Sequence, residues 1–67
     1  MENVQFSEIL KDILIEKDLS QVAFARIVGV KQSQVSEWLK GKAKPGYDSL
    51  KQISIALNIP PSTLLGL

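Results

Sequence analysis

The sequence contains no cysteine and no histidine. These two absences exclude disulfides, thiol chemistry, histidine metal ligands and histidine acid–base catalysis. No apolar run approaches the roughly 20 residues that a membrane-spanning helix needs. The sequence also lacks the pattern of a signal peptide, which is a basic start followed by an apolar stretch and a cleavage signal. We therefore expect a cytoplasmic protein that is not an enzyme, needs no cofactor or metal and has no membrane partner.

The chain has 67 residues, of which 45% are apolar. A chain of this size removes only roughly 60% of its unfolded surface on folding, near the lower limit for a core without disulfides or metals. It has room for one domain, over residues 1–67, and no linker, repeat or low-complexity segment divides it. Side-chain packing alone must therefore hold the predicted fold.

Residues 21–39 carry the pattern of two short helices joined by one sharp turn at Gly29. Apolar residues lie on both sides of this turn, and those after it recur at the i, i+3, i+4 spacing of a helical face. They are Phe24, Ala25 and Val28 before the turn, and Val35, Trp38 and Leu39 after it. Glycine adopts positive φ at little cost, and the small side chain of Ala25 lets two helices cross closely. The segment is therefore predicted to be a helix-turn-helix.

A helix is predicted before this segment, from about residue 4 to residue 17, with Asn3 as its N-cap and Asp18 at its end. Its apolar stripe consists of Phe6, Ile9, Leu10, Ile13 and Leu14. Ser20 is predicted to cap the second helix, and the third is predicted to run from residue 31 or 32 to residue 40.

Two further helices are predicted after the segment. The fourth runs from residue 47 or 48 to residue 57, with Asn58 as its C-cap, and the residues expected to face inward are Leu50, Ile53, Ala56 and Leu57. Ile59 is expected to pack across the following junction. A short final helix is predicted to start at Pro60-Pro61, because proline suits a first helical position.

With these flanking helices, the chain resembles the DNA-binding helix-turn-helix of the lambda repressor and Cro family over nearly its whole length. The residues whose types match that pattern are Gln21, Phe24, Ala25, Val28, Gly29, Val30, Val35 and Trp38. The resemblance implies an all-α fold, a compact bundle of about five short helices whose core is closed by Leu64 and Leu65. It also implies that double-stranded DNA is the partner.

The predicted third helix presents polar side chains on the face away from its apolar residues. They are Gln32, Ser33, Gln34, Ser36 and Glu37. Their amide, hydroxyl and carboxylate groups can hydrogen-bond base edges in the major groove, and by the resemblance they fall on or beside the base-reading positions. Glu37 has two alternative roles, a repulsive filter against wrong sequences or a solvated charge.

Phosphate contacts are expected from Gln21, by the resemblance, and from four lysines around the third helix and the loop after it. These are Lys31, Lys40, Lys42 and Lys44. Lys31 departs from the family pattern, which has a Ser or Thr cap at this place, and it sets a cation against the positive end of the helix dipole. A nearby phosphate would reverse that penalty, so Lys31 is predicted to contact the DNA backbone.

A second departure concerns Leu14 and Leu39. They occupy the places of an Arg–Glu pair that members of the family commonly bury. Two leucines there predict an apolar contact in place of the ion pair, an exchange that is neutral or stabilising in other proteins.

The net charge of +1 conceals an uneven distribution. Residues 1–18 carry five acidic and two basic side chains, a net charge of −3, whereas residues 19–44 carry five basic and one acidic, a net charge of +4. The positive end of the chain therefore coincides with the predicted DNA-reading segment and the loop after it.

These features predict sequence-specific DNA binding by a small phage or bacterial transcriptional repressor or regulator, which inserts the helix at about 31–40 into the major groove. A monomer reads few base pairs, so a homodimer is expected on a pseudo-palindromic operator, with half-sites roughly 34 Å apart. Candidate interface residues are Tyr47, Ile59, Leu64 and Leu67. The alternative is an antitoxin-like or anti-regulator protein-interaction module that retains the fold and contacts a protein partner through Val22 and Ile27.

Overall fold

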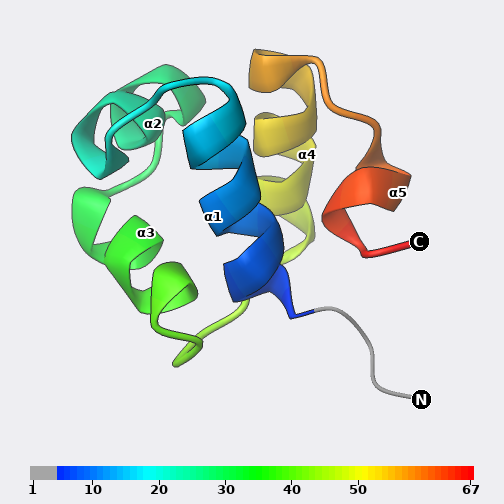
Figure 1. Cartoon of the computed structure of the whole chain (residues 1–67), viewed down its shortest axis with the longest axis horizontal. Coiled ribbons are helices and arrows are strands. Elements are labelled where there is room, and N and C mark those ends of the chain that lie inside the picture. Colours follow the sequence, from blue (N-terminus) through cyan, green and yellow to red (C-terminus); the bar gives the residue numbers. More distant parts are fainter. Residues whose placement is uncertain (1–4) are drawn as a thin grey trace.

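Helices alone form the regular structure of residues 5–67, the part of the chain that this computed structural model describes. In chain order they are α1 (Phe6–Glu16), α2 (Gln21–Val28), α3 (Gln32–Leu39), α4 (Tyr47–Leu57) and α5 (Pro61–Leu64). In Figure 1, α1 crosses the centre of the view, with α2 and α3 on one side and α4 and α5 on the other. The predicted all-α bundle of five short helices is confirmed.

α1 is shorter than the predicted helix at both ends. It begins after Gln5, which is the N-cap residue. The backbone of Gln5 is extended, and its side chain makes no hydrogen bond to the start of the helix. The predicted N-cap Asn3 lies outside the described residues. At the other end Asp18 has a φ of 54°, and the next amide, that of Leu19, donates to the carbonyl of Leu14 at 2.8 Å. Aspartate is among the few residues that tolerate this left-handed conformation, so Asp18 ends the helix as predicted.

The junction between α4 and α5 is held by a side chain as well as by the backbone. Asn58 is left-handed, with a φ of 54°, and ends α4 as predicted. The Ser54 hydroxyl donates to the carbonyl of Ile59 at 2.6 Å, and the Ile59 amide donates back to the Ser54 carbonyl at 3.0 Å. These bonds turn Ile59 into the core, and α5 starts at Pro61, its first helical residue.

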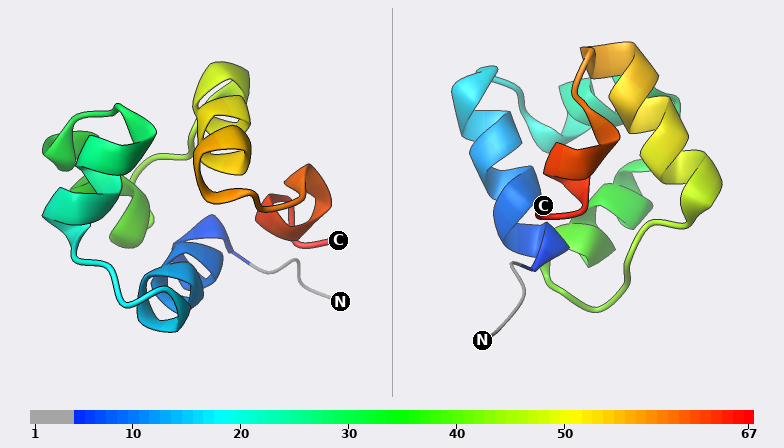
Figure 2. Two further views of the ribbon diagram at one scale, coloured as in Figure 1. Left: turned by 90° about the horizontal axis from the view of Figure 1, so that it is seen from above. Right: turned by 90° about the vertical axis from the view of Figure 1, so that its right-hand side faces the viewer.

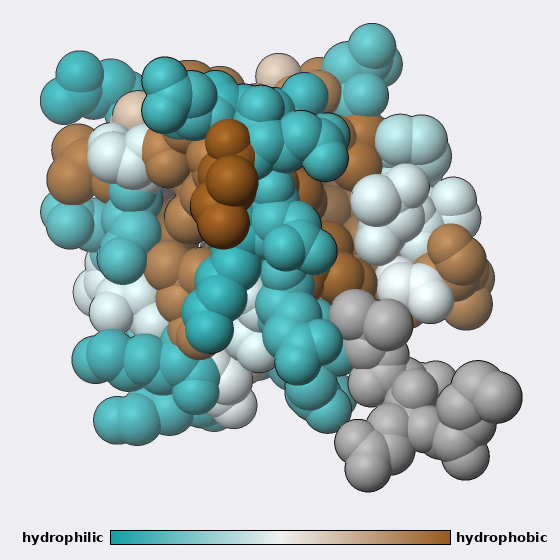
Figure 3. Space-filling model, viewed as in Figure 1, coloured by the Kyte–Doolittle hydropathy of each residue, from teal (hydrophilic) through white to brown (hydrophobic). Residues whose placement is uncertain are grey.

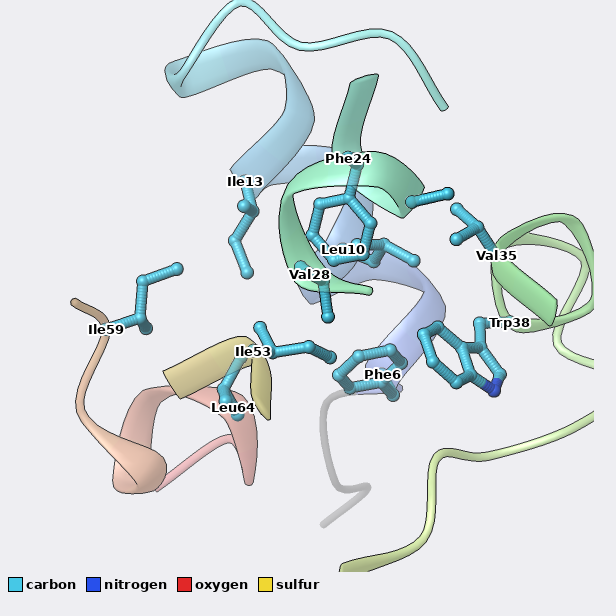
Figure 4. Packing of buried hydrophobic residues seen from close by; sticks show 11 residues of the cluster. Phe6, Leu10, Ile13, Phe24, Val28, Val35, Trp38, Ile53, Ile59 and Leu64 are labelled. Atoms are coloured by element: carbon cyan, nitrogen blue, oxygen red, sulfur yellow. The ribbon is translucent and has the colours of Figure 1, made fainter. Parts of the chain in front are cut away.

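The core lies between all five helices and is apolar throughout the described residues. Its members are Phe6, Leu10, Ile13, Phe24, Ala25, Val28, Val35, Trp38, Ile53, Ile59 and Leu64. Figure 4 shows how their side chains converge from both sides of α1. The rings of Phe6 and Trp38 meet edge to face, with centroids 6.0 Å apart, an arrangement that stabilises beyond burial alone. α1 is thereby fixed against the last turn of α3.

Two residues predicted to face the core do not. Ala56 is exposed, because the buried side of α4 is a narrow strip centred on Ile53. Leu65 is 57% exposed whereas Leu64 is 2% exposed. Leu64 is the last residue of α5, whereas Leu65 is its C-cap and stands at the end of the helix, so the two side chains leave the chain in different directions.

The bundle places the helix-turn-helix at one end of the molecule. α1 packs against α3 and also against α5, and α4 packs against α2 and α5. Figure 2 shows α2 and α3 away from α5 and the C-terminus, in agreement with Figure 1. Among residues 5–67, no helix has the length and apolar character needed to cross a membrane.

Candidate nucleic-acid interface

The turn between α2 and α3 depends on the backbone of Gly29. Its φ of +86° is left-handed, and the amides of Gly29 and Val30 both donate to the carbonyl of Ala25, at 2.9 and 3.0 Å. A Cβ at this position would meet no atom within 4 Å. Glycine is therefore favoured here by the backbone conformation and not by lack of space.

Local bonds and packing together orient the two helices. Ser20 caps α2 as predicted, because its Oγ accepts from the Ala23 amide at 3.1 Å. Further along, α2 buries Phe24, Ala25 and Val28, and α3 buries Val35 and Trp38. With the inner faces of both helices fixed in this way, the opposite face of α3 is turned away from the core.

The predicted base-reading residues differ in how far they are exposed. Gln32, Ser33 and Gln34, in the first turn of α3, are exposed. Ser36 and Glu37 are half-buried, so they are less exposed than the helical pattern predicts for residues of the outward face. The chain folds back over this end of α3, where the Lys42 amide donates to the Glu37 carbonyl at 3.1 Å. The first turn is therefore the most accessible part of the helix.

The start of α3 contains a contact that the sequence reasoning missed. Lys31 is the N-cap residue, but an ammonium group cannot accept a hydrogen bond from the helix. Instead Gln34 reaches back, and its Oε1 accepts from the backbone amide of Lys31 at 3.1 Å. A glutamine three residues after an N-cap is half of a capping box. This signal is present in the sequence, but a lysine at the cap position obscures it.

Exposed cations flank α3 at both ends. Lys31 stands before it, and Lys40, Lys42 and Lys44 follow it in the chain, all exposed. The start of this loop is fixed by Gly41, which has a φ of +75° and donates to the Trp38 carbonyl at 3.2 Å. Together with the Lys42 bond to the end of α3, this is the Schellman arrangement of a helix C-terminus. The first lysines of the loop are therefore held in place relative to α3.

Gln21, the remaining predicted phosphate contact, is the first residue of α2 and is exposed. The first amides of a helix have no partner within it and point along its axis, so a phosphate at this end could be bound by backbone and side chain together. The acidic side chains Glu8, Asp12 and Glu16 belong to α1 instead and are exposed there. Among residues 5–67, no cluster of acidic residues is arranged to hold a metal ion.

A groove of about 430 Å³ lies on the other flank of α1, between this helix, α5 and the junction before it. Its lining residues are Ile9, Asp12, Ile13, Glu16, Lys17, Asn58, Ile59, Pro60 and Thr63. Figure 3 shows hydrophobic surface between the hydrophilic column over α1 and the helices beside it. No residue of α2 or α3 lines this groove, and none of the predicted DNA-contacting residues does.

Comparison with known proteins gives a family but no individual relative. A family model described as helix-turn-helix matches residues 10–64, from within α1 to the end of α5. The comparisons with curated proteins and with solved structures gave no match. Members of the matched family bind DNA and are typically not enzymes. The chain therefore belongs to the helix-turn-helix family of the lambda repressor and Cro type, and it is a DNA-binding regulator of that family.

Proposed function

We propose that the chain is a phage or bacterial transcriptional repressor or regulator that binds one specific duplex sequence by inserting α3 into the major groove. The observation that carries this proposal is the composition of the exposed surface of α3. Polar side chains able to read base edges occupy its first turn, and lysines stand at both of its ends. Base edges supply sequence information, whereas phosphates supply affinity and register.

The proposal divides the exposed residues into two classes. Gln32, Ser33 and Gln34 contact base edges, with Ser36 and Glu37 at the margin of the contact. Gln21, Lys31, Lys40, Lys42 and Lys44 contact phosphates. Each lysine–phosphate contact is expected to steepen the fall of log K with log salt concentration by about 0.9, whereas the neutral Gln21 releases no counterion and leaves this slope unchanged.

Selection of bound sequences from random duplex DNA tests this division. Gln32→Ala should change the preferred sequence, and Lys44→Ala should weaken binding to all sequences alike. The matched controls are Gln52→Ala and Lys51→Ala, because both side chains are exposed on α4 and outside the proposed interface. If Gln32→Ala and Lys44→Ala act alike, the division is wrong.

We also propose a homodimer on DNA, with a smaller set of interface residues than the sequence predicts. Ile59 and Leu64 are 8% and 2% exposed and belong to the core, so they are not available to a second subunit. Tyr47 and Leu67 are 79% and 90% exposed and remain candidates. Sedimentation on duplexes with two half-sites about one helical turn apart tests the proposal, and one subunit per duplex would contradict it.

The alternative function, a module that binds a protein partner, is supported by the groove between α1 and α5. Ile9 is half-buried and contributes apolar surface to it, beside the buried core residues Ile13 and Ile59. Asp12 and Glu16 add two negative charges to this lining against the one positive charge of Lys17. Val22 and Ile27 do not form a joint patch, because five residues along a helix place side chains about 140° apart. Strong binding of a protein partner without salt-dependent DNA binding would favour the alternative.

A further inference from the structure

The side-chain amide of Gln34 is oriented by a bond inside the protein. Its partner, the backbone N–H of Lys31, can only donate, so the atom that meets it at 3.1 Å is the amide oxygen. The oxygen and the NH₂ group lie on opposite sides of one planar carbon. Once the oxygen is turned back to Lys31, the nitrogen points away from the cap.

The nitrogen is available for a contact with DNA. Gln34 is exposed, and among residues 5–67 no protein group accepts a hydrogen bond from its NH₂ group. Its neighbour Gln32 is also exposed, and neither its amide oxygen nor its amide nitrogen makes a hydrogen bond to a residue in the described part of the chain. Two glutamines in the same helical turn therefore differ in the freedom of their amide groups.

We propose that Gln34 contacts DNA as a hydrogen-bond donor only, through its NH₂ group. This inference rests on the proposed insertion of α3 into the major groove. The bidentate pairing of glutamine with adenine needs the oxygen to accept from N6–H and the nitrogen to donate to N7. The bond to Lys31 uses one lone pair of the oxygen and holds this atom against the start of the helix, so it competes with the first half of that pairing. Gln34 therefore recognises an acceptor, such as N7 or O6 of guanine, O4 of thymine or a phosphate oxygen, whereas Gln32 keeps the capacity to pair with adenine.

Double-mutant cycles between protein and DNA test the proposal. One position at a time of the selected duplex is changed to remove one acceptor: a 7-deazapurine lacks N7, 2-aminopurine in place of guanine lacks O6, and 5-methyl-2-pyrimidinone in place of thymine lacks O4. A purine without its exocyclic amino group removes a donor instead. A methylphosphonate linkage in turn removes a charged phosphate oxygen. The Kd of each duplex is measured with the unchanged protein, Gln34→Met and Gln34→Glu, and Gln32→Met provides the matched control.

Gln34→Glu distinguishes loss of the DNA contact from loss of stability. A glutamate still offers an oxygen to the Lys31 amide and suits the first turn of a helix, so its Tm should match or exceed that of the unchanged protein. It lacks the NH₂ donor, as Gln34→Met does. Its added negative charge weakens all duplexes that keep their phosphates alike, so it cancels in the cycles with base analogues. The methylphosphonate cycles use Gln34→Met, because loss of a phosphate charge would also relieve the repulsion of a carboxylate.

The expected result is a coupling of about 3- to 10-fold between Gln34 and one acceptor, the size of one hydrogen bond. In the cycles with base analogues both Gln34 variants should give the same coupling. Coupling to a base that lacks N7, O6 or O4 assigns the acceptor to that base, and coupling to a methylphosphonate assigns it to the backbone. Coupling to an exocyclic amino group, or no coupling at all, overturns the proposal. A chain that selects no duplex sequence overturns the proposed function as well.

Discussion

Leu39, at the end of α3, and Leu14, on α1, are both partly buried and packed against the core. The helices that carry them are in contact. Members of the family commonly hold an acidic and a basic residue at these places, and the two form a pair. We predict that Leu39→Glu, made alone, is strongly destabilising, because it sets an unpaired carboxylate against a core without buried polar side chains in residues 5–67.

The partial burial of Leu39 sets the size of this effect. Removal of one partner from a fully buried ion pair costs about 3–5 kcal/mol, and a fully buried leucine contributes about 1.5–3 kcal/mol. A glutamate at a partly buried position keeps some of its hydration, so we expect the free energy of unfolding to fall by about 2–3 kcal/mol. For a domain of this size that corresponds to a Tm lower by roughly 10–20 °C.

Thermal and urea unfolding should be compared for the unchanged protein, Leu39→Glu, Leu14→Arg and the double variant. If the two side chains meet, the double variant regenerates the ion pair and recovers about 1–3 kcal/mol of the summed loss. If the loss of the double variant equals the sum of the two single losses to within about 0.5 kcal/mol, positions 14 and 39 do not interact. An unchanged Tm for Leu39→Glu would refute the argument from burial.

Three further predictions follow from other parts of the molecule. Gly29→Ala should lower the free energy of unfolding by about 1–2 kcal/mol, the cost of a left-handed backbone with a Cβ, and a urea midpoint equal to that of the unchanged protein would contradict it. Ile53→Ala should cost about 2–5 kcal/mol because this side chain is fully buried, whereas Ile55→Ala, exposed on the same helix, should stay within about 0.5 kcal/mol. Lys31→Ala should reduce the slope of log K against log salt concentration by about 0.9 if Lys31 contacts a phosphate. Lys51→Ala should leave that slope unchanged, and equal slopes for all three proteins would exclude the Lys31 contact.

Several helix ends could be predicted because their causes lie within a few residues of chain. Ser20 caps α2 through an amide three residues away, and the turns at Asp18, Gly29 and Asn58 need only a residue that accepts a positive φ. The exposed first turn of α3 was predictable for a similar reason. Its apolar residues must face α2, so its polar residues must face outward.

The tertiary structure decided what those local rules left open. Leu64 and Leu65 are adjacent and chemically identical, yet only Leu64 lies under the other helices, because α5 is too short for a periodic pattern to define its inner face. Ile59 likewise looked available for a dimer interface until the bonds between α4 and α5 turned it inward.

The sequence by itself determined the helix-turn-helix, its flanking helices and the exposed polar first turn of α3, since apolar spacing, caps and turns act over short distances. Only the tertiary structure decided which apolar side chains are covered. It also decided that the amide oxygen of Gln34 is engaged by Lys31. Burial depends on the elements that pack against a residue, and the orientation of a side-chain amide depends on the atoms that fold around it. Neither is fixed by the identity of the residue alone.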